Sequence, residues 1–127
     1  MQKQYVFLSG LFILISIVLG AMGAHALKNV LEPALFHSFD VAVRYQGFLS
    51  MGVFILALNA DRFQFSIQRI LGAMILGMLL FCGSIYLLIF LQVMHLPKGF
   101  VVALTPIGGS VSIISWLIFL IRLMKNQ

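Results

Sequence analysis

The stretch ILGAMILGMLLFCGSIYLLIFLQ, from Ile70 to Gln92, contains no charged residue. It is long enough to cross the hydrocarbon core of a bilayer as a helix, which takes about 17–25 residues. Three further apolar stretches approach or exceed that length, at Tyr5–Ala24, about Val41–Ala60 and roughly Thr105–Ile121. Hydrocarbon offers no partner for backbone N–H and C=O groups, so each stretch must satisfy its own hydrogen bonds as a helix. The sequence therefore predicts an all-α fold, an integral membrane four-helix bundle.

The composition leaves too few polar residues to cover a water-soluble fold. Of the 127 residues, 62% are hydrophobic and 9% are charged, against about 25% charged in typical soluble domains. Four spans use most of the chain, which predicts one transmembrane domain over residues 1–127, with spans at about 5–24, 38–60, 70–93 and 103–122. The basic residues behind the net charge of +5 lie singly at segment ends. They therefore predict contact with lipid head groups and not with nucleic acid.

The ends of the segments raise two questions of topology. Lys3, the apolar run after it and the small residues of Ala24-His25-Ala26 are similar to a signal peptide. The run from Tyr5 to Leu19 already reaches the upper length limit of such a segment, so we expect a retained first helix. Counting basic residues predicts that both termini are cytoplasmic, because that side carries five of them and the other side three. The five are Lys3, Arg62, Arg69, Arg122 and Lys125, and the three are Lys28, Arg44 and Lys98.

Two prolines mark the expected helix starts. Pro33, which has no N–H to leave unpaired, predicts that the second helix begins near residue 33, and Glu32 suits the positive end of that helix. The segment Phe100–Leu104 is either a surface segment or already part of the fourth helix. In the second case Pro106 lies inside that helix and kinks it.

Small residues at four-residue spacing predict where helices approach closely, since packing in lipid depends on short side chains. We expect these seams to join helices within one chain, with a homodimer seam as the alternative. The expected packing residues are Ser16, Gly20 and Ala24 in the first span, Ala73, Gly77 and Gly83 in the third, and Gly108 and Ser112 in the fourth.

Polar residues gather at the predicted outer side. His37, Asp40 and Arg44 share one face of a helix, and the acid precedes the base by four residues, the favourable order for an ion pair. His25 and His95 belong to the same side. One interpretation is an interfacial polar network, and the other is a small ligand, metal or proton site. The histidine spacing matches no metal motif, so no metal is predicted.

Deeper in the spans the polar groups are neutral, namely Gln46, Ser50, Ser84, Tyr86 and Ser115. A proton-coupled exporter of the small four-helix multidrug type needs a buried carboxylate in its first helix, and this first span has none. No nucleophile with a paired base, phosphate loop or carboxylate pair is present, so the sequence does not predict an enzyme. Cys82 is assigned to packing, since a thiol in hydrocarbon is poorly ionised.

Several strings occur in a recognisable order: Gly20–Lys28, Tyr45-Gln46, Phe81–Tyr86, Leu104–Gly109 and Trp116. Together they resemble the YgdD-like family of small membrane proteins, known as domain of unknown function 423. The family usually has a histidine-rich run after the tyrosine, where this chain has glycine, phenylalanine and leucine. The resemblance implies a four-helix fold in the bacterial inner membrane and implies no activity. By similarity, the candidate site residues are His25, Asp40, Arg44, Tyr45, Gln46, Ser84, Tyr86 and Thr105.

These observations predict a multi-pass inner-membrane protein with a non-enzymatic accessory or structural role and no cofactor. Its expected partners are membrane lipids, and other membrane proteins or a second copy are further candidates. One alternative is a channel or carrier for a small solute, entered at His25, His37, Asp40 and Arg44. The other is a membrane protein that binds a lipid, a quinone or haem.

Overall fold

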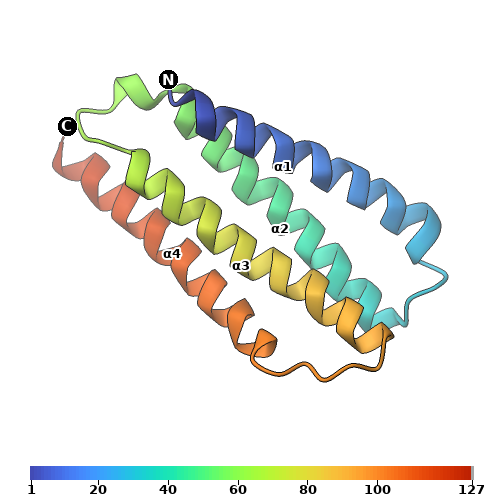
Figure 1. Cartoon of the computed structure of the whole chain (residues 1–127). Helices are drawn as coiled ribbons and strands as arrows, with labels where there is room; N and C mark the ends of the chain where they lie inside the picture. The colour runs from blue at the N-terminus through green and yellow to red at the C-terminus, as the bar shows by residue number, and fades with distance from the viewer. Residues whose placement is uncertain (127) are drawn as a thin grey trace.

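The computed structural model describes residues 1–126 as four long helices with two short helical turns (Figure 1). Each long helix has the length and composition to cross a membrane. The predicted all-α four-helix fold is therefore confirmed. The long helices are α1 (Lys3–Met22), α2 (Pro33–Leu58), α3 (Gln68–Val93) and α4 (Val101–Lys125), and the short turns are η1 (Gly23–Leu27) and η2 (Ala60–Arg62).

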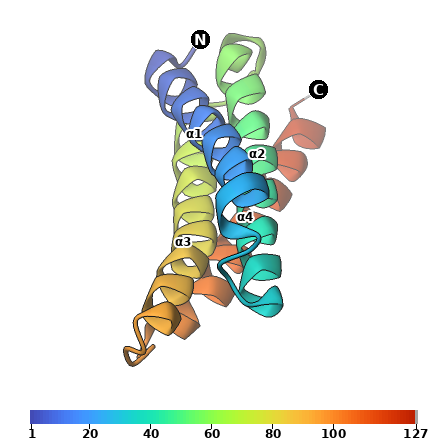
Figure 2. The ribbon, with the colours of Figure 1, turned by 90° about the vertical axis from the view of Figure 1, so that its right-hand side faces the viewer.

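The helices run up and down, each beside the next in the chain (Figure 1). α2 and α3 are in contact, α1 packs mainly on α2, and α4 packs mainly on α3. Viewed from the side, α1 and α4 lie at the front and the back of the α2–α3 pair (Figure 2). Both termini and the α2–α3 connection lie at one end, called the terminal end below. The opposite end, called the loop end, carries the α1–α2 and α3–α4 connections.

The helix starts follow from the backbone chemistry of particular residues. α2 begins at Pro33, as predicted, and the extended backbone of Glu32 turns the chain into it. In the α3–α4 connection His95 and Gly99 have positive φ values of 55° and 51°, which reverses the chain within a few residues. α4 begins at Val101, so Pro106 lies inside the helix, as in the second of the two alternatives.

The core lies between the two central helices. One buried cluster near the terminal end includes Val53, Leu71, Met74 and Phe119, and a smaller one near the loop end joins Phe39, Val43 and Ile89. α1 buries only two of its described side chains, Ser9 and Ser16. Large apolar side chains cover the outward surfaces of α1 and α4, as expected for helices that face lipid tails.

Close approach between helices occurs at some of the predicted small residues. A Cβ atom on Gly108 would lie 2.7 Å from the backbone carbon of Leu80, and one on Gly77 would lie 2.8 Å from the backbone nitrogen of Ser112. The backbones of α3 and α4 therefore touch at this crossing. Between α1 and α2 the approach is looser, since a Cβ on Gly47 would stand 3.3 Å from the Ser16 hydroxyl.

The other expected packing residues have different surroundings. A Cβ on Gly20 would make an ordinary contact with Val43 at 3.5 Å. Ala73 is half-buried between α3 and α4. Ala24 and Gly83 are exposed, and a Cβ on Gly83 would meet nothing within 4 Å. The expectation that these two residues lie in close helix seams is corrected. Ala24 belongs to η1, and at Gly83 a cavity separates α3 from the α1 side chains that line its other wall.

Candidate functional site

The charged residues of the loop end form one ion pair and no common site. Arg44 Nη2 lies 2.8 Å from Asp40 Oδ2 on neighbouring turns of α2, as the spacing predicted. His25 on η1, His37 on α2 and His95 after α3 are all exposed at this end. Within residues 1–126, His, Cys, Asp and Glu side chains do not come together in a group that could hold a metal ion.

A hydrogen-bonded chain connects α3, α2 and α1 inside the bundle. The Tyr86 hydroxyl donates to Gln46 Oε1 at 2.8 Å, and Gln46 Nε2 donates to the backbone carbonyl of Phe12 at 2.9 Å. Gln46 is buried, so these bonds form where water cannot replace them. Sequence reasoning selected Gln46 and Tyr86, but it did not identify their partnership or the Phe12 carbonyl.

A second polar contact connects α3 and α4. The hydroxyls of Ser84 and Thr105 lie 2.6 Å apart, and Ser84 Oγ also lies 2.9 Å from the Phe81 carbonyl. Tyr45, by contrast, is half-exposed and makes an edge-to-face contact with Phe81, with ring centroids 5.5 Å apart. The candidate residues therefore divide among four places: the loop end, the α1–α2–α3 chain, the α3–α4 contact and the Tyr45–Phe81 pair.

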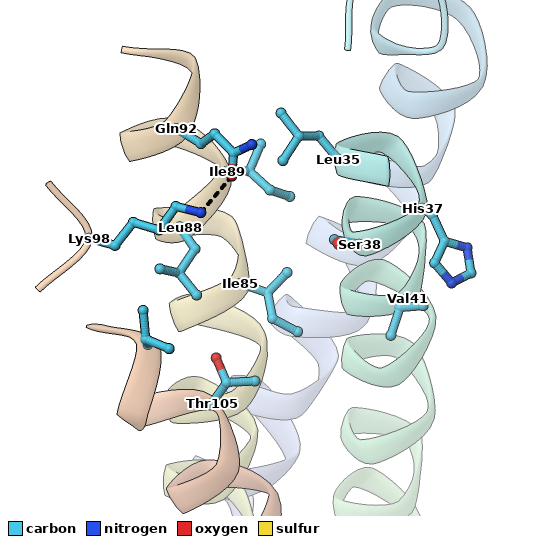
Figure 3. A pocket seen from close by; sticks show the side chains of 11 residues that line it. Leu35, His37, Ser38, Val41, Ile85, Leu88, Ile89, Gln92, Lys98 and Thr105 are labelled. Atoms are coloured by element: carbon cyan, nitrogen blue, oxygen red, sulfur yellow. Dashed lines mark hydrogen bonds between the residues drawn. The ribbon is translucent and has the colours of Figure 1, made fainter. Parts of the chain in front are cut away.

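Between α2 and α4, two cavities lie end to end over α3. The first, called the Lys98 cavity, has a volume of about 420 Å³ and opens at the loop end (Figure 3). Its lining residues are Leu35, His37, Ser38, Val41, Ile85, Leu88, Ile89, Gln92, Lys98, Val102 and Thr105. The second, called the Trp116 cavity, has a volume of about 480 Å³ and includes Tyr45, Phe81, Ser112 and Trp116.

Except for Thr105, the polar groups of the Lys98 cavity lie at its mouth. Lys98 Nζ donates to Gln92 Oε1 at 2.8 Å (Figure 3). The hydroxyl of Ser38 bonds to the carbonyl of Ala34 in its own helix. Figure 3 shows the His37 ring turned away from the other labelled side chains, so the histidine contributes little to the mouth. Sequence reasoning placed Lys98 at this end but did not connect it with Gln92.

The arrangement of motifs along this fold agrees with a known family. The model for "Protein of unknown function (DUF423)" matches residues 19–109, which run from the end of α1 into α4. The chain belongs to the DUF423 family. The predicted resemblance is thereby confirmed, and the matched range contains both polar contacts except for the Phe12 carbonyl.

Relatives of this DUF423 member are membrane proteins by name. It is 30% identical to the UPF0382 membrane protein YwdK of Bacillus subtilis, over 98% of each chain. It is 32% identical to a UPF0382 membrane protein of Haemophilus influenzae, over 92% of this chain and 90% of the relative. A UPF0382 membrane protein of Schizosaccharomyces pombe is 34% identical over 85% of this chain and 91% of the relative. No solved structure matches the chain.

Proposed function

We propose that this DUF423 member is a non-enzymatic accessory component of the bacterial inner membrane, acting through lateral contacts with lipids and other membrane proteins. The observation that carries the proposal is the state of the polar groups inside the bundle. They are neutral, and all of the buried polar side chains described except Ser112 have a hydrogen-bond partner within the bundle. Such groups stabilise a fixed arrangement of helices and offer little to a passing solute.

The hydrogen bonds of the buried polar side chains support this argument. Within residues 1–126 these side chains are six serines and Gln46. All except Ser112 take part in a hydrogen bond, the majority of them to a carbonyl of their own helix. A path for ions or protons requires groups that exchange partners or titrate. Neutral side chains with fixed partners therefore favour a structural role over a conduit.

The exposed apolar surfaces of α1 and α4 are the surfaces through which lateral contacts would form. α1 exposes Phe7, Leu14 and Ile17, with 73%, 57% and 63% of each residue uncovered. α4 similarly exposes Ile113 and Leu117. Apolar surface gains no free energy by moving from lipid tails to a protein contact. A second helix therefore associates with these faces through van der Waals packing, and not through the hydrophobic effect. These broad faces can accept either lipid chains or a neighbouring helix.

The proposed orientation places both termini in the cytoplasm. The even number of spans brings the termini to one end, and that end carries the larger share of basic residues. The Bacillus and Haemophilus relatives support a bacterial membrane as the location. A phosphatase fused after residue 127 is expected to be inactive, and a fluorescent protein fused there is expected to be bright. The reverse pattern would contradict this orientation.

Flux through reconstituted liposomes tests the accessory role against a conduit. Proton entry is followed with a trapped pH-sensitive dye, and glycerol entry is followed by light scattering after an osmotic step. Liposomes with the protein are expected to match protein-free liposomes for both probes. Flux several-fold faster, and lost on Gln46→Leu, would overturn the proposal. Cross-linking in native membranes tests the lateral role, and recovery of the chain solely as an isolated monomer would contradict it.

A further inference from the structure

The Lys98 cavity has an unusual charge balance at its mouth. The Lys98 ammonium bonds to the neutral Gln92 amide, and no carboxylate lines the cavity within the described part of the chain. Asp40, the acid within α2, is paired with Arg44. Lys98 therefore brings a positive charge without an acidic partner to the edge of the membrane.

Below the mouth the cavity becomes apolar. Leu35, Val41, Ile85 and Leu88 supply most of its walls. The hydroxyl of Thr105 faces this space in Figure 3, but its O–H is directed to Ser84 Oγ, because the Ser84 O–H is donated to the Phe81 carbonyl. Thr105 can therefore accept a further hydrogen bond but has no O–H left to donate. A cationic mouth above an apolar trough matches an amphiphile with an anionic head and a hydrocarbon chain.

The cavity covers the headgroup-proximal part of one leaflet. From Gln92 at the mouth to Ile85, the deepest α3 residue that lines it, α3 rises by about 10 Å, at about 1.5 Å per residue. Half of the hydrocarbon core of a bilayer is about 15 Å thick. The edge-to-face pair of Tyr45 and Phe81 stands one turn further along α3, where both residues line the Trp116 cavity.

We propose that the Lys98 cavity is a binding site for one anionic glycerophospholipid. Its phosphate lies at the Lys98 ammonium, and the first part of one acyl chain runs along α3 between α2 and α4 as far as Val41 and Ile85. The choice of a lipid over a helix follows from the charge and the length together, since a cavity about 10 Å long is too short for a helix that crosses both leaflets. The site goes beyond the accessory role, because a lipid can bind there whether or not a protein partner exists.

Competition between two lipids with the same chains tests the proposal. The detergent-solubilised full chain is mixed with dioleoylphosphatidylglycerol and dioleoylphosphatidylcholine in equal amounts, and bound lipid is counted by native mass spectrometry. The wild-type chain is expected to retain one phosphatidylglycerol in preference. Lys98→Gln is expected to weaken that binding about fivefold and to leave phosphatidylcholine unchanged. Lys28→Gln, an exposed lysine at the same end outside the cavity, is the control for general charge.

A second pair of variants tests the path of the chain. Val41→Phe fills the cavity and is expected to reduce binding, whereas Val93→Phe adds the same group on an exposed site outside it. If the wild-type chain shows no preference for phosphatidylglycerol, that result alone overturns the proposal. Equal losses in the two lysine variants, or in the two valine variants, would also overturn it. Displacement by glycerol phosphate as effective as displacement by the lipid would refute the acyl-chain assignment.

Discussion

A single methyl group at Gly108 is expected to disrupt the contact between α3 and α4. A Cβ atom there would lie 2.7 Å from the backbone carbon of Leu80 and 2.8 Å from its Cβ. Carbon atoms pack best at about 3.5–4.0 Å, so α3 and α4 must separate locally by about 1 Å to accept alanine. The obstruction is backbone, which cannot turn aside as a flexible side chain does.

The loss of stability follows from the packing lost along the seam. Each atom pair contributes about 0.1–0.2 kcal/mol, and a gap of about 0.5–1 Å removes a quarter to a half of it. With about 50 pairs affected, comparable to one buried leucine, the loss is about 1–5 kcal/mol. We therefore expect Gly108→Ala to lower the free energy of unfolding by about 3 kcal/mol.

Reversible unfolding by SDS in mixed micelles measures this loss, with the fluorescence of Trp116 as the signal. The matched control is Gly83→Ala, because a Cβ at Gly83 meets nothing within 4 Å. That variant is expected to keep or slightly raise the stability, since alanine is the better helix former. Equal effects of the two substitutions would refute the reasoning, because close backbone approach would then not distinguish the two glycines.

Four further substitutions probe three other contacts. Gln46→Leu is expected to lower the free energy of unfolding by about 1–2 kcal/mol. In a double-mutant cycle with Tyr86→Phe, the double variant is expected to lose less stability than the sum of the two single losses. Full additivity would argue against the hydrogen bond between the two side chains. Arg44→Gln breaks the exposed pair with Asp40 and is expected to change stability by less than about 1 kcal/mol in the same SDS titration. A larger loss would indicate that the pair is buried in the membrane. Trp116→Ala removes an indole that a Cβ on Gly52 would touch at 2.7 Å, and is expected to cost about 3 kcal/mol by circular dichroism; a silent substitution would contradict that contact.

Local chemistry made much of the fold predictable. The lengths of the apolar stretches indicated four helices, and Pro33 indicated the start of α2 because its effect depends on neighbouring backbone alone. Which helix faces pack against each other was harder to predict. Small residues mark every face that could pack closely, but only the three-dimensional arrangement shows which of these faces are in contact. Gly108 therefore meets backbone, whereas Gly83, with a similar pattern around it, faces open space.

The polar contacts divide in the same way. The Asp40–Arg44 pair was predictable because both residues lie on one helix, four positions apart. The bond between Tyr86 and Gln46 joins residues on different helices, so it depends on their depth and rotation. The Lys98 cavity could not be predicted from the sequence either. It forms because the α3–α4 connection brings Lys98 next to Gln92, which depends on the three-dimensional arrangement.

The closed interior of the bundle can be tested with the native chain, which has one cysteine. Cys82 is buried beside the Gln46–Tyr86 contact, so a charged thiol reagent added to folded protein in liposomes reports whether water reaches that depth. The control is Ser66→Cys with Cys82→Ser, which places the thiol in an exposed loop. The account predicts rapid labelling of the control and no labelling of Cys82 until SDS unfolds the protein. Rapid labelling of Cys82 in the folded protein would contradict it.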